Sequence, residues 1–493
     1  PPALPPERHM NAPAAAHPTM PMPEEFSTTL DLQRQAYLAK PNPTYKERVA
    51  DLKTLARMLR ENQAALVEAI NRDYGNRSEF ETLFSEFFVV LDGIGDTLKQ
   101  LKGWMKPMKR HVDALLYPLA KNKLLAQPMG VVGVIVPWNF PLNLSIAPLT
   151  SIFAAGNRAM VKMSENSNHL ARTLIALSPR YFPRDKLAFF ADGDGRGPAF
   201  SALAFDHLLF TGSGQTGRAV MANAARNLTP VTLELGGKAP AIVGPDFSIK
   251  TAAERILWLK LLNAGQVCTT VDYLFLPEGK VDEFVAHAKR LVAQRYPDIN
   301  STDFTSIIDE RAYQRLHATL ADAQAKGATL VNLSPSSQAN AAQRKFVPHL
   351  VLGATPDMTL LQREIFGPIL PILTYRDPEE VVRYITARDR PLAIYPFTHD
   401  KRLQDLFIHR TLSGGVSINE GGLHVVQHDL PFGGVGASGM GHYHGREGFV
   451  TFSKLRPIYY QGPFSPIQML FQPPFANNKA LGIMKWLIKL KVF

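Results

Sequence analysis

The chain has 493 residues, of which 45% are hydrophobic and 20% charged, and its formal net charge is +11. This composition is ordinary for a globular protein with large cores, and the length suggests roughly two to four domains. Its single cysteine excludes a disulfide scaffold and a cysteine-rich metal site, so we expect a cytoplasmic protein and assign no metal ligands. Lysine and arginine are mostly spread through helical segments, which argues against a nucleic-acid partner.

The amino-terminal part is expected to be helical after a leader. Residues 1–25 are rich in proline and alanine and lack the apolar segment of a signal peptide, so we expect disorder there. From Tyr45 to Tyr74 apolar residues recur at helical spacing, and Glu79 to Lys102 forms a second such stretch. Ala114 to Gly130 alternates weakly, which predicts a hairpin.

Beyond Gly130, short apolar strands alternate with helical segments, as in right-handed βαβ units. The first series of expected strands is "VVGVIVP", "AMVKMS", "LAFFADG", "HLLFTGS" and "VTLELGG". The second series is "PAIVG", "YLFLPEG", "ATLVNL", "ILPILTY", "LAIYPFT" and "GGVSIN". We therefore predict an α/β fold with two doubly wound parallel-sheet domains that join near Gly236 and Gly237.

Two carboxy-terminal segments differ from this alternation. Leu430 to Phe449 is rich in glycine, which predicts a loop packed closely against another part of the chain. The last 17 residues interleave lysine with apolar residues, which predicts an amphipathic helix or strand that covers apolar surface. The alternative for this tail is an anchor at a membrane surface, because it is too short and too charged to span a bilayer.

A literal G-x-G-x-x-G occurs at Gly212, Gly214 and Gly217, between an expected strand and an expected helix. Backbone amides at such a helix start favour a pyrophosphate, which indicates dinucleotide binding. Glu234 follows Gly217 by 17 residues, near the roughly 20-residue offset of a ribose-binding carboxylate. The alternative is a glycine-rich turn without a ligand.

Cys268, in "LLNAGQVCTTVDY", leaves two interpretations open. Gly265 allows close backbone approach there, as a reactive site requires. A thiol with an ordinary pKa of about 8.5 is a poor nucleophile at neutral pH without help from charge, a base or dipoles. No histidine lies near it in the sequence, and a lone cysteine is more often a buried, inert side chain.

Eight segments together resemble, in order, the signature segments of aldehyde dehydrogenases. The similarity covers Tyr37 to Lys454 and is strongest to the class 3 branch, and within it to bacterial coniferyl aldehyde dehydrogenases. The segments are "VPWNFPLN", "AAGNRAMVKMSE", "FTGSGQTG", "VTLELGGKAPAIV", "NAGQVC", "REIFGPILP", "SGGVSIN" and "LPFGGVGASGMGHYHGREGF".

This resemblance implies three catalytic residues. Cys268 is expected to attack the aldehyde carbon, giving a thiohemiacetal that becomes a thioester after hydride transfer. The Asn139 amide and the Cys268 backbone N–H form the expected oxyanion hole, and Glu234 is the expected base that activates water. We prefer this role of Glu234 to the ribose role, because family members usually have threonine where this chain has Gly214, so the literal fingerprint is accidental.

The resemblance also implies a cofactor site. Lys162 and Glu165 are expected on the adenosine ribose, and Trp138 beside the cofactor or the substrate. NAD is the expected cofactor, with NADP as the alternative, because the Glu165 carboxylate repels a 2′-phosphate. The remaining cofactor-binding residues are Gly212, Ser213 and Gly217 at the pyrophosphate and Glu364 and Phe366 at the nicotinamide end.

The expected division of the chain follows from the same resemblance. Residues 26–110 and 128–235 form the dinucleotide-binding domain, 236–425 the catalytic domain, 111–127 and 426–460 a bridging and oligomerisation arm, and 461–493 a tail. The expected assembly is a homodimer. The expected substrate is an aromatic aldehyde of the coniferaldehyde or benzaldehyde kind, and the alternative is a medium-chain aliphatic aldehyde.

The sequence departs from the family pattern at several positions, among them Gly214, Val271, Arg363 and Glu420. These departures bear on cofactor fit and, less, on substrate fit. None removes a catalytic group, but they leave a second hypothesis open, in which the chain is a silent relative that binds NAD without turnover.

Overall fold

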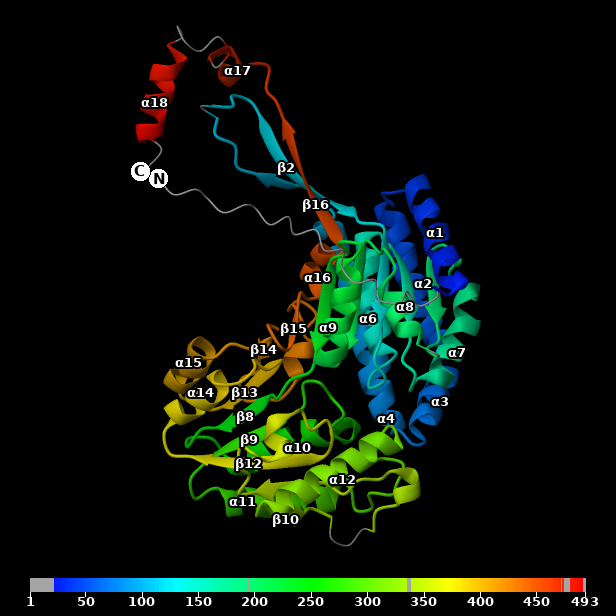
Figure 1. Ribbon diagram of the computed structural model, residues 1–493, viewed down its shortest axis with the longest axis vertical. Coiled ribbons are helices and arrows are strands. Elements are labelled where there is room, and N and C mark those ends of the chain that lie inside the picture. Colours follow the sequence, from blue (N-terminus) through cyan, green and yellow to red (C-terminus); the bar gives the residue numbers. More distant parts are fainter. Residues whose placement is uncertain are drawn as a thin grey trace, which may run out of the picture.

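The computed structural model describes residues 22–490 apart from 115, 194, 335–337, 471 and 474–478. Two separate sheets carry most of the fold, and a third, small sheet projects from them (Figure 1). The first 21 residues of the expected leader lie outside the described part. Helix α1, Glu24–Ala39, begins two residues inside the segment that we expected to be disordered.

The first sheet has six strands in the order β15-β7-β6-β3-β4-β5, and all neighbours are parallel except β15 and β7. The strands are β3 Val131–Ile135, β4 Arg158–Lys162, β5 Leu187–Phe190, β6 His207–Gly212, β7 Val231–Leu235 and β15 Gly439–Met440. The helices that connect these strands are α6 Asn143–Ala155, α7 Asn168–Leu177, α8 Arg196–Ser201 and α9 Gly214–Ala225.

The second sheet has seven strands in the order β10-β11-β12-β9-β8-β13-β14, and only β10 and β11 are antiparallel. The strands are β8 Pro240–Val243, β9 Tyr273–Pro277, β10 Thr329–Asn332, β11 His349–Leu352, β12 Ile369–Tyr375, β13 Ala393–Phe397 and β14 Gly415–Val416. The helices are α10 Ile249–Leu261, α11 Val281–Arg295, α12 Glu310–Ala325, α13 Thr359–Gln362, α14 Pro378–Thr386 and α15 Lys401–Arg410. The predicted α/β fold with two parallel sheets is thus confirmed.

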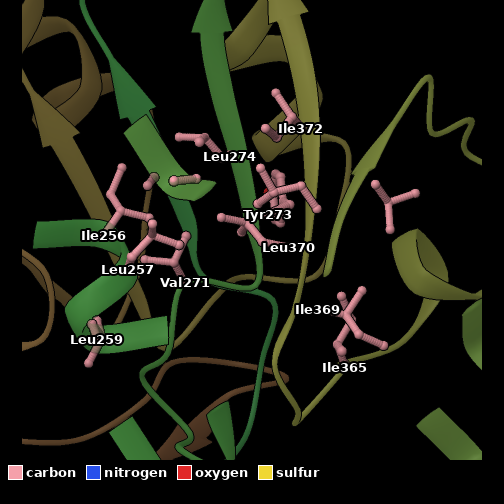
Figure 2. Packing of buried hydrophobic residues seen from close by; sticks show 14 of the residues in the cluster. Ile256, Leu257, Leu259, Val271, Tyr273, Leu274, Ile365, Ile369, Leu370 and Ile372 are labelled. Atoms are coloured by element: carbon pink, nitrogen blue, oxygen red, sulfur yellow. The ribbon is translucent and has the colours of Figure 1, made fainter. Parts of the chain in front are cut away.

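The core of the second sheet explains its strand pattern. Strands β8, β12 and β13 are buried on both faces along most of their length, so they read as continuous apolar runs rather than alternating ones. Figure 2 shows Ile256 and Leu257 of α10 close to Val271, with Leu274 of β9 and Ile372 of β12 nearby. All five side chains are buried and belong to one cluster.

The third sheet is antiparallel and consists of β1 Met108–Arg110, β2 Lys121–Pro128 and β16 Ser453–Tyr460. The hairpin predicted over Ala114 to Gly130 is therefore wrong, because β2 is the one strand described in that range and its partners lie outside it. Strand β16 pairs with all eight residues of β2, a contact between segments more than 300 residues apart that local alternation does not reveal.

The amino-terminal helices follow the predicted stretches but are interrupted. Tyr45 to Tyr74 forms α2 Tyr45–Glu61 and α3 Gln63–Tyr74, and Thr44 and Glu47 cap α2 reciprocally. The second stretch comprises α4 Glu79–Thr82, a π-helical turn Leu83–Phe88 and α5 Val89–Trp104. A π-turn has an extra residue and therefore shifts which side chains face inward.

We expected the glycine-rich segment Leu430–Phe449 to be a loop. It is a loop only in part, because it contains β15 and the start of α16 Gly445–Thr451. Gly439 pairs with Glu234 of β7. It has a φ of +140°, and a Cβ there would overlap the carbonyl oxygen of Leu233. The glycine thus permits the antiparallel contact that covers the edge of the first sheet.

The described tail contains α17 Pro466–Leu470 and α18 Ala480–Leu490. The tail is helical, but Leu481, Trp486 and Ile488 are more than half exposed in the single chain, so they do not cover apolar surface there as expected. Among the described residues, no helix is long and apolar enough to cross a membrane.

A buried ion pair joins the segment before α4, the π-turn and the loop that leads into α6. Nη1 of Arg77 lies 2.8 Å from Oε1 of Glu86, and both side chains are fully buried. Glu86, in the π-turn, also accepts hydrogen bonds from the backbone N–H groups of Leu142 and Asn143 at the start of α6. Arg77 donates to the carbonyl oxygen of Asn139 at 3.0 Å. The pair therefore fixes the loop between β3 and α6.

We expect Arg77→Leu to lower the free energy of unfolding by about 3–5 kcal/mol, because it leaves the Glu86 carboxylate buried without its cation. Arg376→Leu is the matched control, since Arg376 and Glu278 form an exposed pair whose loss should change stability far less. Urea unfolding followed by tryptophan fluorescence measures both changes. Equal stability of the two variants would contradict the structural role of the buried pair.

Candidate active site

Cys268 lies just after a tight turn that follows α10. The 3-10 turn Leu262–Gly265 contains three consecutive residues with positive φ, Asn263, Ala264 and Gly265. A Cβ at Gly265 would overlap the carbonyl oxygen of Gly367, so the turn packs directly on the segment before β12. This contact explains the glycine that precedes the cysteine in the sequence.

Amide side chains and backbone oxygens hold Asn139 beside this turn. The Asn139 side-chain amide donates to the carbonyl oxygen of Gln266 at 3.3 Å. The Asn263 amide in turn donates to the carbonyl oxygens of Asn139 and Gln266, at 3.2 and 3.1 Å. Because these side chains are buried, the network fixes the two loops relative to each other.

Two cavities meet at Cys268. We call the first the aromatic cavity; it is lined by Phe84, Phe140, Trp258, Phe432, Tyr443 and His444, among other mostly apolar residues. We call the second the carboxylate cavity; it is lined by Trp138, Asn139, Glu234, Glu364 and Phe366. Cys268 lines both, and so it separates an apolar space from one that contains two carboxyl groups.

Glu234 is the penultimate residue of β7 and is 3% exposed. Neither oxygen of its carboxyl group has a hydrogen-bond partner among the described residues. Burial raises the pKa of this carboxyl group well above its usual value. A buried, unpaired carboxyl group is costly, and such groups concentrate at functional sites.

The surroundings of Cys268 favour the neutral form of its thiol. Burial is the main cause that raises its pKa to about 12, and the charges of Glu364 and Glu234 raise it further. The backbone N–H groups of Cys268 and Thr269 act in the opposite direction. A thiolate at this position therefore requires that the charge nearby changes or that a bound molecule alters the site.

The Glu364 side chain lies against Gly236, in the segment that connects the two large sheets. A Cβ at position 236 would overlap the Glu364 carboxylate, so the glycine there provides the space that this side chain occupies. Burial and then the charge of Asp272 raise the pKa of Glu364 to about 8. The aromatic rings of Trp138 and Phe366 meet edge to face at 5.5 Å in the same cavity.

A third cavity continues from the second along the first sheet. It contains Lys162, Glu165 and Asp192, and it shares Trp138, Gly212 and Ser213 with the carboxylate cavity. The two spaces are thus adjacent and together run from Glu165 to Cys268. Lys162 forms an ion pair with Asp192 at 2.6 Å, a partner that the sequence did not indicate.

Glu234 lines the cavity of Cys268, whereas Glu165 lines the neighbouring one. This placement separates the two acidic residues that competed for the ribose role. It favours the interpretation in which Glu234 faces the thiol and Glu165 remains beside the strand end of β4.

The three glycine positions of the fingerprint differ in whether a larger side chain could be accommodated. A Cβ at Gly212 would lie 2.6 Å from Phe210, and one at Gly217 would lie 2.7 Å from Leu235. A Cβ at Gly214 would meet only Arg218, at an ordinary 3.7 Å. Gly214 is therefore not required by packing, while Gly217 allows α9 to lie close to β7. Ser213 caps α9, since its hydroxyl accepts from the Thr216 N–H.

Three of the departures from the family pattern, Val271, Arg363 and Glu420, lie outside the cavities. Arg363 is exposed, although it precedes Glu364. Glu420 pairs with Arg255 at 3.6 Å, and Val271 is fully buried in the core of the second sheet. None of the three lines the carboxylate cavity.

Sequence reasoning missed the aromatic cavity. Its walls come from the π-turn, α6, α10, the segment after β14 and the segment before α16, which are distant in the sequence. The glycine-rich segment was a signal that something packs there, but its pattern did not indicate that Phe432, Tyr443 and His444 face the same space as Cys268.

Comparison with known proteins identifies the family. The profile of the aldehyde dehydrogenase family matches residues 22–458. The chain is 49% identical over 461 residues to a probable coniferyl aldehyde dehydrogenase of Pseudomonas aeruginosa, covering 93% of this chain and 95% of that protein. It is 34% identical to the dimeric, NADP-preferring aldehyde dehydrogenase of Rattus norvegicus, covering 87% of this chain and 93% of that protein. The chain therefore belongs to the aldehyde dehydrogenase family.

Solved structures agree with this assignment. The substrate-bound state of Staphylococcus aureus AldH has a TM-score of 0.87 at 31% identity, covering 94% of this chain and 99% of that one. An aldehyde dehydrogenase of Mycobacterium tuberculosis, solved with NAD⁺, has a TM-score of 0.79 at 25% identity, covering 89% and 90%. The protein is thus an NAD(P)-dependent oxidoreductase that acts on an aldehyde.

Replacement of Glu364 by glutamine should accelerate alkylation of Cys268 in the cofactor-free enzyme several-fold at about pH 9. At that pH Glu364, with a pKa of about 8, is mostly ionised and raises the thiol pKa, so removing its charge increases the thiolate fraction. Glu234→Gln should have the smaller effect, and the exposed Glu310→Gln none. Iodoacetamide labelling followed by mass spectrometry measures the rates; a slower Glu364→Gln would refute this electrostatic account.

The fingerprint glycines provide a matched pair. We expect Gly214→Ala to keep NAD affinity within about twofold, because its Cβ meets open space apart from Arg218. Gly217→Ala should weaken NAD binding or lower stability by about 1–3 kcal/mol, because its Cβ is forced against Leu235. Titration of NAD by calorimetry, with thermal unfolding in parallel, distinguishes them. A large loss of affinity in Gly214→Ala would restore the literal fingerprint.

Proposed function

We propose that this enzyme oxidises aromatic aldehydes of the hydroxycinnamaldehyde or benzaldehyde class to carboxylic acids. The observation that carries this substrate class is the aromatic cavity, which begins at Cys268 and is lined by aromatic and aliphatic side chains. The similarity to coniferyl aldehyde dehydrogenases of two Pseudomonas species, at 49% and 41% identity, supports the same class.

In this proposal Cys268 is the nucleophile. Its sulfur attacks the aldehyde carbon as thiolate, and the carbonyl oxygen becomes an oxyanion. The Asn139 amide and the Cys268 backbone N–H donate to that oxygen, where negative charge develops. The hydrogen bond that Asn139 makes to Gln266 supports this role, because it orients the amide before the substrate arrives. NAD(P), when bound, accepts the hydride from the carbon.

Glu234 is the proposed base for the second half-reaction. The acyl group remains on the Cys268 sulfur as a thioester, and water must lose a proton to attack it. Glu234 shares the cavity with the thiol and has no hydrogen-bond partner in the part of the chain that the structure describes, so its oxygens are free for a water molecule. A carboxyl pKa raised by burial makes it a stronger base than an exposed glutamate.

The cofactor is proposed to lie along the two cavities on the first sheet. Lys162 and Glu165 hold the adenosine ribose, and the backbone of Gly212, Ser213 and Gly217 lies at the pyrophosphate. Trp138, Glu364 and Phe366 surround the nicotinamide end, since they line the space with Cys268. NAD is the proposed preference because the Glu165 carboxylate repels a 2′-phosphate.

The small sheet supports a homodimer. Strands β2 and β16 extend away from the two large sheets in Figure 1, and Tyr459 and Tyr460 of β16 are 48% and 46% exposed. We infer that residues 111–127 and 426–460 form an arm that meets a second copy, and that 26–110 with 128–235 binds the dinucleotide while 236–425 carries the nucleophile. The lone thiol favours a reducing compartment, the cytoplasm.

The test is NADH formation from NAD with coniferaldehyde, benzaldehyde and hexanal. We expect turnover with the two aromatic aldehydes, and Cys268→Ala should abolish it. Glu234→Gln should lower steady turnover at least about 100-fold while acyl-enzyme accumulates, because only the hydrolytic step needs the base. Glu310→Gln, on the exposed start of α12, is the matched control that keeps full activity.

Several outcomes would contradict the proposal. Preference for hexanal would favour an aliphatic substrate. Loss of NAD affinity in Glu234→Gln, without acyl-enzyme, would return Glu234 to the ribose. Binding of NAD without turnover of any aldehyde would identify a silent relative.

A further inference from the structure

Two polar side chains in the wall of the aromatic cavity have a buried polar atom without a protein partner. These atoms are the Ser85 hydroxyl oxygen and Nδ1 of His444, among the residues that the structure describes. Two other polar side chains in the wall are bonded: Thr150 donates to the Ile146 carbonyl oxygen, and His428 contacts Asp92 at 3.0 Å. An unpaired polar atom in an otherwise apolar wall indicates a place where a ligand supplies the partner.

His444 is held rigidly by aromatic neighbours. Its ring stacks on Phe432, with centroids 5.4 Å apart and planes 29° apart, and meets Tyr443 edge to face at 4.6 Å. Burial, followed by the nearby His428 and His424, lowers its pKa to about 3. The imidazole is therefore neutral, with one nitrogen that donates and one that accepts.

The position of His444 relative to Cys268 sets the direction of a substrate. Cys268 lines both the aromatic and the carboxylate cavity, but His444 lines only the aromatic one. A substrate whose carbonyl carbon lies at the sulfur has room in the aromatic cavity, away from Glu234 and Glu364, and the wall of that cavity contains His444.

The wall also limits the chemistry of the group that His444 meets. No lysine, arginine, aspartate or glutamate lines the aromatic cavity among the described residues. A charged substituent would lose its hydration there without an opposite charge in compensation. An uncharged hydroxyl on an aromatic ring suits both the apolar surroundings and a neutral imidazole.

We propose that His444 is a specificity-determining residue whose imidazole accepts a hydrogen bond from a phenolic hydroxyl at the end of the substrate opposite the aldehyde. This inference rests on the proposed oxidation of aromatic aldehydes and deepens it. It assigns the enzyme a preference for hydroxylated over unsubstituted cinnamaldehydes, because only the hydroxylated ring satisfies the unpaired imidazole.

The experiment compares kcat/KM for 4-hydroxycinnamaldehyde with that for cinnamaldehyde. In the wild-type enzyme we expect the ratio to favour the hydroxylated substrate. His444→Phe keeps a ring against Phe432 and Tyr443 but removes the acceptor, so the ratio should fall about fivefold to tenfold, as expected for one hydrogen bond to a neutral group. Ser85→Ala should keep the ratio, and His409→Phe, exposed on α15, is the matched surface control.

Three results would overturn the inference. The first is an equal loss for both substrates in His444→Phe, which would show a packing role only. The second is a fall of the ratio in Ser85→Ala alone, which would assign the hydroxyl to the other unpaired group. The third is a wild-type enzyme that prefers cinnamaldehyde.

The role of His444 and the oxidation of aromatic aldehydes can fail separately in this experiment. If His444→Phe does not fold, His444→Leu replaces it, and the ratio of the two substrates remains the readout. A wild-type enzyme that oxidises cinnamaldehyde but ignores the hydroxyl leaves the proposed function intact and overturns only the role of His444. A wild-type enzyme that oxidises neither aldehyde overturns the proposed function and the inference with it.

Discussion

The site depends on how closely the chain passes between its two large sheets. Glu234 lies near the end of β7, the last parallel strand of the first sheet, and β8 of the second sheet begins only a few residues later. Gly236 and Gly237 make this passage possible, since a Cβ at Gly236 would overlap Glu364 and one at Gly237 would press on the backbone of Leu392. Bulkier residues would separate the sheets and withdraw Glu234 from the cavity of Cys268.

This closeness brings three ionisable groups into one cavity. Burial raises the pKa of Cys268, Glu234 and Glu364, and the charges of the two carboxylates add to the effect on the thiol. Like charges at close range in a low-dielectric site cannot all be present together, so the site favours neutral forms. A thiolate at Cys268 therefore depends on a change in the charge nearby.

Much of the architecture could be predicted because it depends on local patterns. Buried parallel strands are continuous apolar runs, and their alternation with helices indicated both sheets and the junction at Gly236. The hairpin at Ala114 to Gly130 was wrong, and the loop at Leu430 to Phe449 was only partly right, because the strands there pair with distant segments. Likewise, the ion pair of Lys162 with Asp192 joins the ends of two strands and follows from no spacing in the sequence.

The sequence by itself determined the fold class, the family and the residue types available for chemistry, since one cysteine and eight ordered motifs constrain these directly. Only the tertiary structure decided what those residues face. It placed Glu234 with Cys268 rather than with Glu165, showed that Gly214 is not needed for close packing, and assembled the aromatic cavity from five distant segments. The physical reason is that burial and contact arise from packing between segments, whereas periodicity records only which face of each element is apolar.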